Sequence, residues 1–204
     1  VMSLTGLVEK RVVDKEQALI GPQEAKNSMT GNLCRCTGYE SLVNAACSID
    51  LSNEIPLRKN HLPDSHIKEL KEISNSELFI ETQTFKCFLP KSLKQAVAHF
   101  AKEKNCRIVS GASDLGVQNN KTNAGFGSLM SLQKIPELRK LSFDKQKRIK
   151  VGALVSLADL RSILKEKHPV FSSFLDIFAS PQIKNVATLV GNVVNASRIA
   201  DTPP

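Results

Sequence analysis

The sequence predicts an α+β protein, in which a small all-helical domain is followed by the first part of an α+β domain. Three observations support this fold class. Apolar residues recur at helical spacing over residues 1–52, a charged and proline-interrupted stretch follows over 53–78, and short alternating apolar runs lie between helical patterns over 79–204. We therefore expect a helical domain, then an exposed linker with at most a short helix near 67–73, then an incomplete mixed domain.

Three helices are expected in the first domain. The second helix begins after Gly21, with Pro22 at its first position. The third begins at the turn 31–39, because Thr37 and Glu40 have the spacing of a capping box. The apolar face of the first helix consists of Val1, Leu4, Val8 and Val12. The buried stripe of the third consists of Leu42, Val43, Ala46 and Cys47.

Strands and helices alternate in the second domain. Ser92 and Ser156 each open a helix with the spacing of a capping sequence. Short strands are expected at 85–89, 107–109, 129–132 and 149–153. The apolar face of the helix after Ser92 consists of Leu93, Ala96, Val97, Phe100 and Ala101. The face of the helix after Ser156 consists of Leu157, Leu160 and Leu164.

Composition restricts the class of partner. The 204 residues include 28 basic and 20 acidic side chains, a net charge of +8, which suits an acidic cofactor, an acidic subunit or a nucleic acid. The basic residues are dispersed, and one Tyr with no Trp leaves little stacking surface, so nucleic acid is disfavoured. Neither a signal peptide nor an apolar run long enough for a membrane span is recognised. We expect a cytoplasmic protein, and a piece of a longer chain because it begins with Val and ends on two prolines.

The cysteines point to a metal centre. Five cysteines, an odd number, argue against a secreted disulfide framework. Cys34 and Cys36 lie two apart in the glycine-flanked turn 31–39, a spacing that can direct both sulfurs at one metal. The third helix would direct the positive end of its dipole toward Cys36. Buried, inert thiols are expected at Cys47, Cys87 and Cys106. Surface or packing roles are expected for His61, His66, His99 and His168.

Two segments of the second domain could hold a phosphate-bearing cofactor. The first is the small-residue turn 109–115 after a strand, where successive backbone N–H groups can converge on a pyrophosphate. The second is 185–201, rich in small hydrogen-bonding residues and ending in Asp201, which could accept from a ribose or ribityl hydroxyl. Gly125-Phe126-Gly127 lacks the third glycine of a dinucleotide fingerprint, so a Rossmann fold is not expected.

These segments carry a family resemblance. The run PQEAKNSMTGNLCRCTGYESLVNAA resembles the all-helical [2Fe–2S] domain of the xanthine dehydrogenase family of molybdenum hydroxylases, in which a preceding C-x-x-C supplies two further cluster ligands. The second region resembles the family's FAD-binding domain, of the vanillyl-alcohol-oxidase (PCMH) type. Its matching segments are RIVSGASDLGV, KIPELRKL, IKVGALVSLADL and IKNVATLVGNVVNASRIADTPP. The whole chain resembles the small iron–sulfur and FAD subunit of a bacterial xanthine dehydrogenase.

The resemblance implies roles for particular residues. Cys34 and Cys36 would ligate a [2Fe–2S] cluster as thiolates, and Phe178 would lie near the flavin. The FAD pyrophosphate would be wrapped by the backbone of Ile108, Val109, Ser110, Gly111, Ala112, Ser113, Asp114 and Leu115. Ribityl and phosphate groups would be held by Thr188, Asn192, Asn195 and Asp201. The sequence departs from the family where Val190 replaces a glycine, Arg198 replaces a proline and Ala112-Ser113 replaces Gly-Thr.

The function that the resemblance implies is electron transfer in purine catabolism. Substrate would be oxidised at a molybdenum cofactor on a separate large subunit, and electrons would pass through [2Fe–2S] clusters to FAD and then to NAD. The expected partners are that large subunit and NAD, and no catalytic side chain is expected in this chain. Three alternatives stay open: an aldehyde- or CO-oxidising molybdenum hydroxylase, a small zinc module that uses Cys34 and Cys36, and a non-catalytic piece that docks a partner. The zinc module is disfavoured because no second cysteine pair exists.

Overall fold

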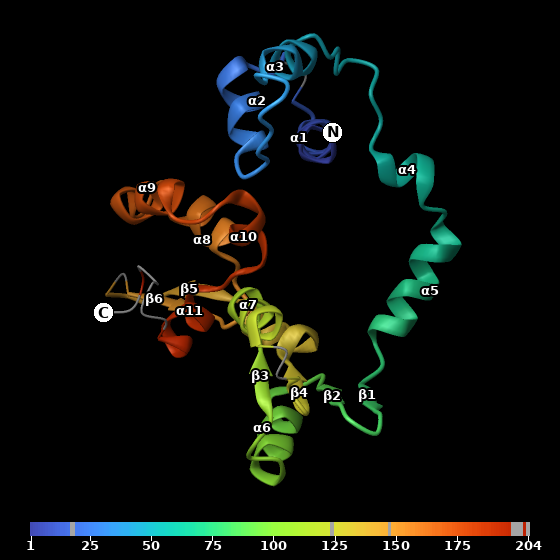
Figure 1. Cartoon of the computed structure of the whole chain (residues 1–204), viewed down its shortest axis with the longest axis vertical. Helices are drawn as coiled ribbons and strands as arrows, with labels where there is room; N and C mark the ends of the chain where they lie inside the picture. The colour runs from blue at the N-terminus through green and yellow to red at the C-terminus, as the bar shows by residue number, and fades with distance from the viewer. Residues whose placement is uncertain (17–18, 123–124, 147, 197–201, 203–204) are drawn as a thin grey trace. The chain divides into compact units, whose positions relative to one another are not determined.

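The structure is a computed structural model that describes the chain except residues 17–18, 123–124, 147, 197–201 and 203–204. The chain divides into two units, Val1–Lys71 and Glu72–Pro204. The first unit contains helices, whereas the second combines helices with strands (Figure 1). The expected α+β class is therefore confirmed. Within the described residues, no helix has the length and apolar character needed to cross a membrane.

The first unit has a small helical core. Its main helices are α1 (Met2–Val13), α2 (Pro22–Met29) and α3 (Glu40–Cys47). Pro22 occupies the first turn of α2, as expected. The buried core consists of Ile20, Ala25, Met29, Val43, Ala46 and Leu51. The apolar residues packed against it include Leu4, Val8, Val12, Leu42 and Cys47, which confirms the predicted face of α3 and that of α1 except for Val1. Val1 precedes α1 and is 98% exposed, so its place on the packed face was wrong.

The start of α3 differs from the prediction. The helix begins at Glu40, and Tyr39 precedes it with a left-handed backbone (φ +64°) and no side-chain cap. The Thr37 hydroxyl accepts a weak hydrogen bond from the N–H of Tyr39 at 3.4 Å, not from the helix amides. The predicted capping box does not form, because Gly38 and Tyr39 both have a left-handed backbone and turn the chain before the helix begins.

The segment expected to be a linker contains two helices, α4 (Leu57–His61) and α5 (Asp64–Ser74), neither of which has a buried residue. The prediction of at most a short helix was wrong because Pro56 and Pro63 start these helices instead of interrupting them. Proline has no backbone N–H, but at the start of a helix this N–H would have no acceptor inside the helix, so its absence costs nothing there. The end of α5 is held by Lys134, whose Nζ donates to the carbonyls of Ile73 at 3.4 Å and Ser76 at 2.8 Å.

A mixed four-stranded sheet opens the second unit. Its order is β1 (Leu78–Glu81), β2 (Lys86–Leu89), β4 (Ser128–Ser131) and β3 (Arg107–Val109). β1 is antiparallel to β2, and β4 is parallel to both of its neighbours. The 3-10 helices η1 (Leu132–Lys134) and η2 (Pro136–Arg139) follow β4. The core on this sheet consists of Ala96, Cys106, Met130 and Ile135. The edge strand β1 was not predicted, because all four of its residues are exposed and give no alternating pattern.

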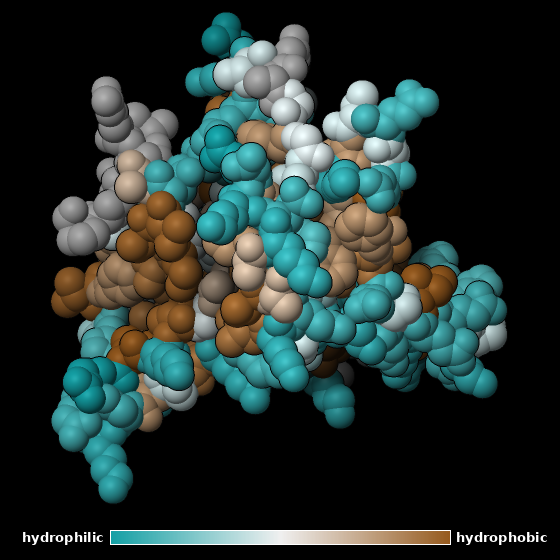
Figure 2. Space-filling model, turned by 90° about the horizontal axis from the view of Figure 1, so that it is seen from below, coloured by the Kyte–Doolittle hydropathy of each residue, from teal (hydrophilic) through white to brown (hydrophobic). Residues whose placement is uncertain are grey.

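Helix α6 (Leu93–Lys102) begins as predicted, because the Ser92 hydroxyl accepts from the N–H of Gln95 at 3.2 Å. The predicted apolar face is present but lies largely at the surface: only Ala96 is buried, and Val97 is 62% exposed. The side of α6 that meets the sheet runs through Ala96 and His99, whose ring lies 4.6 Å from that of Phe88. The apolar stripe is left at the surface, and Figure 2 shows apolar patches among hydrophilic side chains in the view from below.

Helices around a hairpin form the second layer of this unit. The hairpin pairs β5 (Leu141–Phe143) with β6 (Ile149–Val151). The helices are α7 (Ser113–Thr122), α8 (Leu157–Leu164), α9 (Pro169–Ile177), α10 (Pro181–Val186) and α11 (Leu189–Asn195). The predicted stripe of α8 is buried, in a core of Val155, Leu157, Leu160, Leu164, Leu175 and Ala187. Buried Lys184 donates from Nζ to the carbonyls of Leu175 at 2.8 Å and Asp176 at 3.1 Å, which ties α10 to the end of α9. Burial lowers the pKa of this lysine.

Candidate cofactor site

The two segments predicted to contact a phosphate-bearing cofactor meet at the end of β3. The hydroxyl oxygens of Ser110 and Thr188 lie 3.1 Å apart, although 78 positions separate them in the sequence. Ser110 donates its hydroxyl proton to the carbonyl of Ala153 at 2.5 Å, so Thr188 is the donor to Ser110. The N–H of Gly191 in turn donates to Thr188 Oγ1 at 3.1 Å. One directed chain of hydrogen bonds therefore joins three segments of the unit.

Gly111 brings the same segments into backbone contact. A Cβ placed on Gly111 would lie 1.9 Å from the carbonyl oxygen of Val186 and 2.7 Å from its carbonyl carbon. Neither atom belongs to a flexible side chain, so only glycine permits this approach. Glycine at this position is required by the protein's own backbone, independently of any ligand.

The turn after Gly111 leads directly into α7. The N–H of Gly116 donates to the carbonyl of Ala112 at 2.8 Å, which closes the first helical turn. The N–H groups of residues 113–115 precede this bond and have no partner inside the helix. The side chain of Gln133 donates to the carbonyl of Ser110 at 2.9 Å and fixes the turn from the other side. Backbone donors at a helix start suit an anionic group, so the residues fit the pyrophosphate of FAD.

Ala112 adopts a left-handed backbone, with φ +58°. This conformation costs a residue with a Cβ roughly 1–2 kcal/mol, and glycine recovers that strain at an entropic cost of about 0.4–1 kcal/mol. We expect Ala112→Gly to raise the free energy of unfolding by about 0.5–1 kcal/mol in urea titration. The control Ala158→Gly, inside the regular helix α8, should lower it by about 1 kcal/mol. Equal losses in both variants would contradict a strained turn.

The remaining predicted residues of the second segment lie on or after α11. Val190 takes a helical position and is absent from the residues with positive φ, so the missing family glycine does not distort the backbone. Asn192 is half-buried, and its side-chain oxygen accepts from the hydroxyl of Thr202. Asn195 is exposed at the end of the helix. Asp201 and Arg198 lie outside the described residues.

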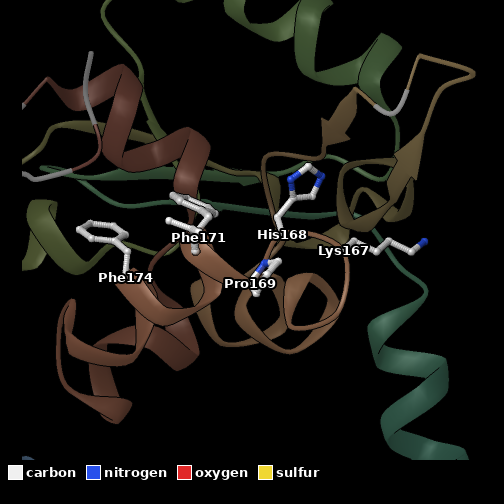
Figure 3. A pocket seen from close by; sticks show the side chains of 6 residues that line it. Lys167, His168, Pro169, Phe171 and Phe174 are labelled. Atoms are coloured by element: carbon white, nitrogen blue, oxygen red, sulfur yellow. The ribbon is translucent and has the colours of Figure 1, made fainter.

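Phe178 belongs to an aromatic stack along α9. Its ring lies 5.4 Å from that of Phe174, which lies 5.8 Å from Phe171. Phe178 is half-buried against the core of the second layer. The other end of the stack lines a shallow hollow, where His168 and Phe171 lie near each other and Lys167 extends away from the phenylalanines (Figure 3). The hollow contains none of the predicted site residues.

The cysteine turn forms a second, separate candidate site in the first unit. The N–H of Cys36 donates to Cys34 Sγ at 3.4 Å, and this bond, with help from Thr37, lowers the pKa of Cys34. Cys34 is half-buried and Cys36 is exposed. Two thiols on one turn fit half of the ligand set of a [2Fe–2S] cluster. Among the described residues, no group of three or more His, Cys, Asp or Glu side chains could hold a metal ion.

Sequence reasoning missed two residues that support the Ser110 turn. Ala153 contributes a backbone carbonyl and Gln133 a side-chain amide to the Ser110 turn. A carbonyl acceptor is common to every residue type, so no sequence signal reveals Ala153. His99 and His168 pack on phenylalanine rings, which agrees with the packing role expected for them.

Comparisons with known proteins place this geometry in a family. Residues 83–204 match the family model described as the FAD binding domain in molybdopterin dehydrogenase. Xanthine dehydrogenase of Oryza sativa subsp. japonica is 25% identical over 89% of this chain and 18% of its own length. Xanthine dehydrogenase/oxidase of Rattus norvegicus is 24% identical over 89% of this chain and 17% of its own length. The chain thus spans less than a fifth of these relatives.

A solved structure shows the same fold. The reconstituted CO dehydrogenase from Oligotropha carboxidovorans is 25% identical and aligns with a TM-score of 0.55, over 60% of this chain and 44% of that chain. Together with the family match, this defines the second unit as an FAD-binding domain of a molybdenum hydroxylase. The chain belongs to the family of FAD-binding domains in molybdopterin dehydrogenases, and the predicted relationship is confirmed.

Proposed function

We propose that the chain is the electron-transfer portion of a cytoplasmic xanthine dehydrogenase, with a [2Fe–2S] domain over 1–52 and an FAD-binding domain over 79–204. The observation that carries the proposal is the hydrogen bond between the Ser110 and Thr188 hydroxyls, which lies inside the segment that matches the FAD-binding family. FAD, when bound, supplies the conversion between one-electron transfer from iron–sulfur clusters and hydride transfer to NAD. Substrate oxidation would take place at a molybdenum cofactor on a large partner subunit.

In this proposal the chain's own residues bind and orient the cofactors. The free amides at the start of α7 would hold the pyrophosphate, because charge-assisted hydrogen bonds to backbone N–H groups are about twice as strong as neutral ones. Gly111 and the Thr188–Ser110–Ala153 chain keep these amides in place before FAD arrives, which reduces the ordering cost of binding. Cys34 and Cys36 would hold one side of the cluster as thiolates.

A second candidate within the same family is an aldehyde- or CO-oxidising enzyme. Indole-3-acetaldehyde oxidase of Arabidopsis thaliana is 24% identical over 86% of this chain, close to the value for the xanthine dehydrogenases. The CO dehydrogenase structure favours this candidate as well. The two candidates share the FAD domain and differ in the partner that oxidises the substrate. Reduction of the bound flavin on anaerobic addition of xanthine, an aldehyde or CO to the intact enzyme separates them, because this readout does not depend on the final electron acceptor.

Removal of the Thr188 hydroxyl tests the FAD site. Thr188 is buried, and Thr188→Val keeps its shape but leaves the N–H of Gly191 and the hydroxyl of Ser110 without this partner. A buried donor that loses its acceptor costs about 1–3 kcal/mol. We expect the intact parent enzyme to bind FAD roughly tenfold more weakly, as measured by flavin fluorescence titration of the deflavinated protein.

The matched control is Ser142→Ala, which removes an exposed hydroxyl from β5 in the same unit. FAD affinity in this variant should equal that of the wild type. Equal affinity in Thr188→Val and wild type would refute the site, and a wild-type enzyme that binds no flavin would refute the flavoprotein function.

A further inference from the structure

Tyr39 connects the cysteine turn to α3 through its side chain. The N–H of Cys34 donates to the Tyr39 hydroxyl, and that hydroxyl donates to the carbonyl of Asn32 at 3.1 Å. A phenol can accept one hydrogen bond and donate another, and Tyr39 uses both capacities on the turn. The chain has a single tyrosine, and it occupies this position.

The backbone of Tyr39 has an equally specific conformation. Gly38 and Tyr39 are both left-handed, with φ of +63° and +64°. The two residues reverse the chain between Cys36 and α3, so the Tyr39 side chain reaches back across the turn. Left-handed backbone is unfavourable for a bulky residue and persists where surrounding contacts fix it. The two hydroxyl bonds provide such contacts.

The other end of Tyr39 is fixed in the core of the first unit. Its carbonyl accepts from the N–H of Val43 at 3.0 Å, the first helical bond of α3. Val43 is buried in the helical core. A rigid connection therefore runs from the core, through Tyr39, to the amide of Cys34.

We propose that Tyr39 is a positioning residue that closes the cysteine turn so that Cys34 and Cys36 face one metal cluster. The inference rests on the proposed [2Fe–2S] function of the first unit. With the Cys34 amide bound to Tyr39, the turn brings the N–H of Cys36 to Cys34 Sγ. Hydrogen bonds to ligand sulfurs are one of the protein's means of setting the potential of an iron–sulfur cluster. Loss of the phenol hydroxyl would relax this arrangement without removing a ligand.

The test uses Tyr39→Phe, which keeps the ring and removes only the hydroxyl. In the full 204-residue chain, amide hydrogen exchange at Cys34 should become about 3- to 10-fold faster, the range that the loss of one such hydrogen bond allows. In the intact parent protein, the variant should lose iron to a chelator roughly tenfold faster, as loss of an outer-shell partner typically weakens metal affinity 10–100-fold. The EPR signal of the remaining cluster should shift, and its midpoint potential should become more negative.

The matched control is Ser48→Ala, which removes a hydroxyl that donates to the carbonyl of Ala45 at the other end of α3. This variant should keep the wild-type exchange rate at Cys34 and the wild-type EPR signal. Unchanged exchange in Tyr39→Phe would overturn the proposal, as would faster exchange with unchanged EPR, potential and iron retention. A wild-type parent without any cluster would instead overturn the proposed iron–sulfur function, because the exchange measurement needs no metal.

Discussion

A methyl group added at Gly111 is expected to lower the free energy of unfolding by about 2–3 kcal/mol and to abolish flavin retention. The Cβ of Gly111→Ala would lie 1.9 Å from the carbonyl oxygen of Val186, so one of the two backbone segments must move. Movement of either segment separates Ser110 from Thr188 and breaks the hydrogen-bond chain. Urea titration of the 204-residue chain and the flavin content of the intact enzyme after gel filtration measure the two effects.

The control Gly116→Ala lies five residues further along, inside α7, where an added Cβ meets no atom within 4 Å. Alanine is the better helix former, so this variant should gain about 0.5–1 kcal/mol and keep its flavin. If Gly111 serves only the approach of a ligand, Gly111→Ala would lose flavin at unchanged stability, and the structural role assigned to this glycine would be disproved.

Replacement of Cys36 by Ser is expected to remove one [2Fe–2S] cluster from the intact parent protein. A serine hydroxyl at neutral pH is a poor substitute for a thiolate ligand of iron. Cys36 is exposed, so the free energy of unfolding of the 204-residue chain should change by less than about 0.5 kcal/mol. Iron content per protein and the EPR spectrum of the reduced enzyme check the first expectation, and urea titration checks the second.

Cys47→Ala is the matched control, and the opposite pair of effects is expected: lower stability with unchanged iron content. Cys47 packs against the helical core and lies in α3, outside the cysteine turn. Its truncation should cost about 1 kcal/mol of stability and leave iron content and EPR unchanged. Wild-type iron content in Cys36→Ser would exclude this residue as a ligand.

Elements were predictable from the sequence where one side of a segment is buried. The stripe of α8 and the core-facing residues of α1 and α3 follow helical spacing because each packs on a core. α6 has an equally clear stripe, yet it leaves Leu93 and Val97 at the surface. The helical spacing of apolar residues predicts that a helix is amphipathic, but it does not predict whether other elements cover the apolar side.

The sequence predicted which two segments contribute to the candidate cofactor site, but not the hydrogen bonds that join them. Small residues after β3 and over 185–201, a range that includes α11, identified the two segments, because such residues allow close backbone approach. The bond between Ser110 and Thr188, the carbonyl of Ala153 and the amide of Gln133 depend on the tertiary fold. The prediction of a capping box at the start of α3 was wrong for a related reason. The left-handed backbone of Tyr39 is disfavoured locally and is fixed by contacts across the turn.

The bond between Ser110 and Thr188 also has a consequence for the order in which the domain matures during translation. The turn at Ser110 is synthesised 78 residues before Thr188, its partner. At about 5–20 residues per second, the nascent chain waits roughly 4–16 s with this turn unsupported. During that interval Gly111 also lacks the Val186 backbone that packs on it. A contact that joins such distant positions forms late, because the intervening loop must first be closed. The Ser110 turn is therefore completed only after the chain has reached α11. If FAD binds at this turn, as proposed, flavin loading would belong to the last stage of folding.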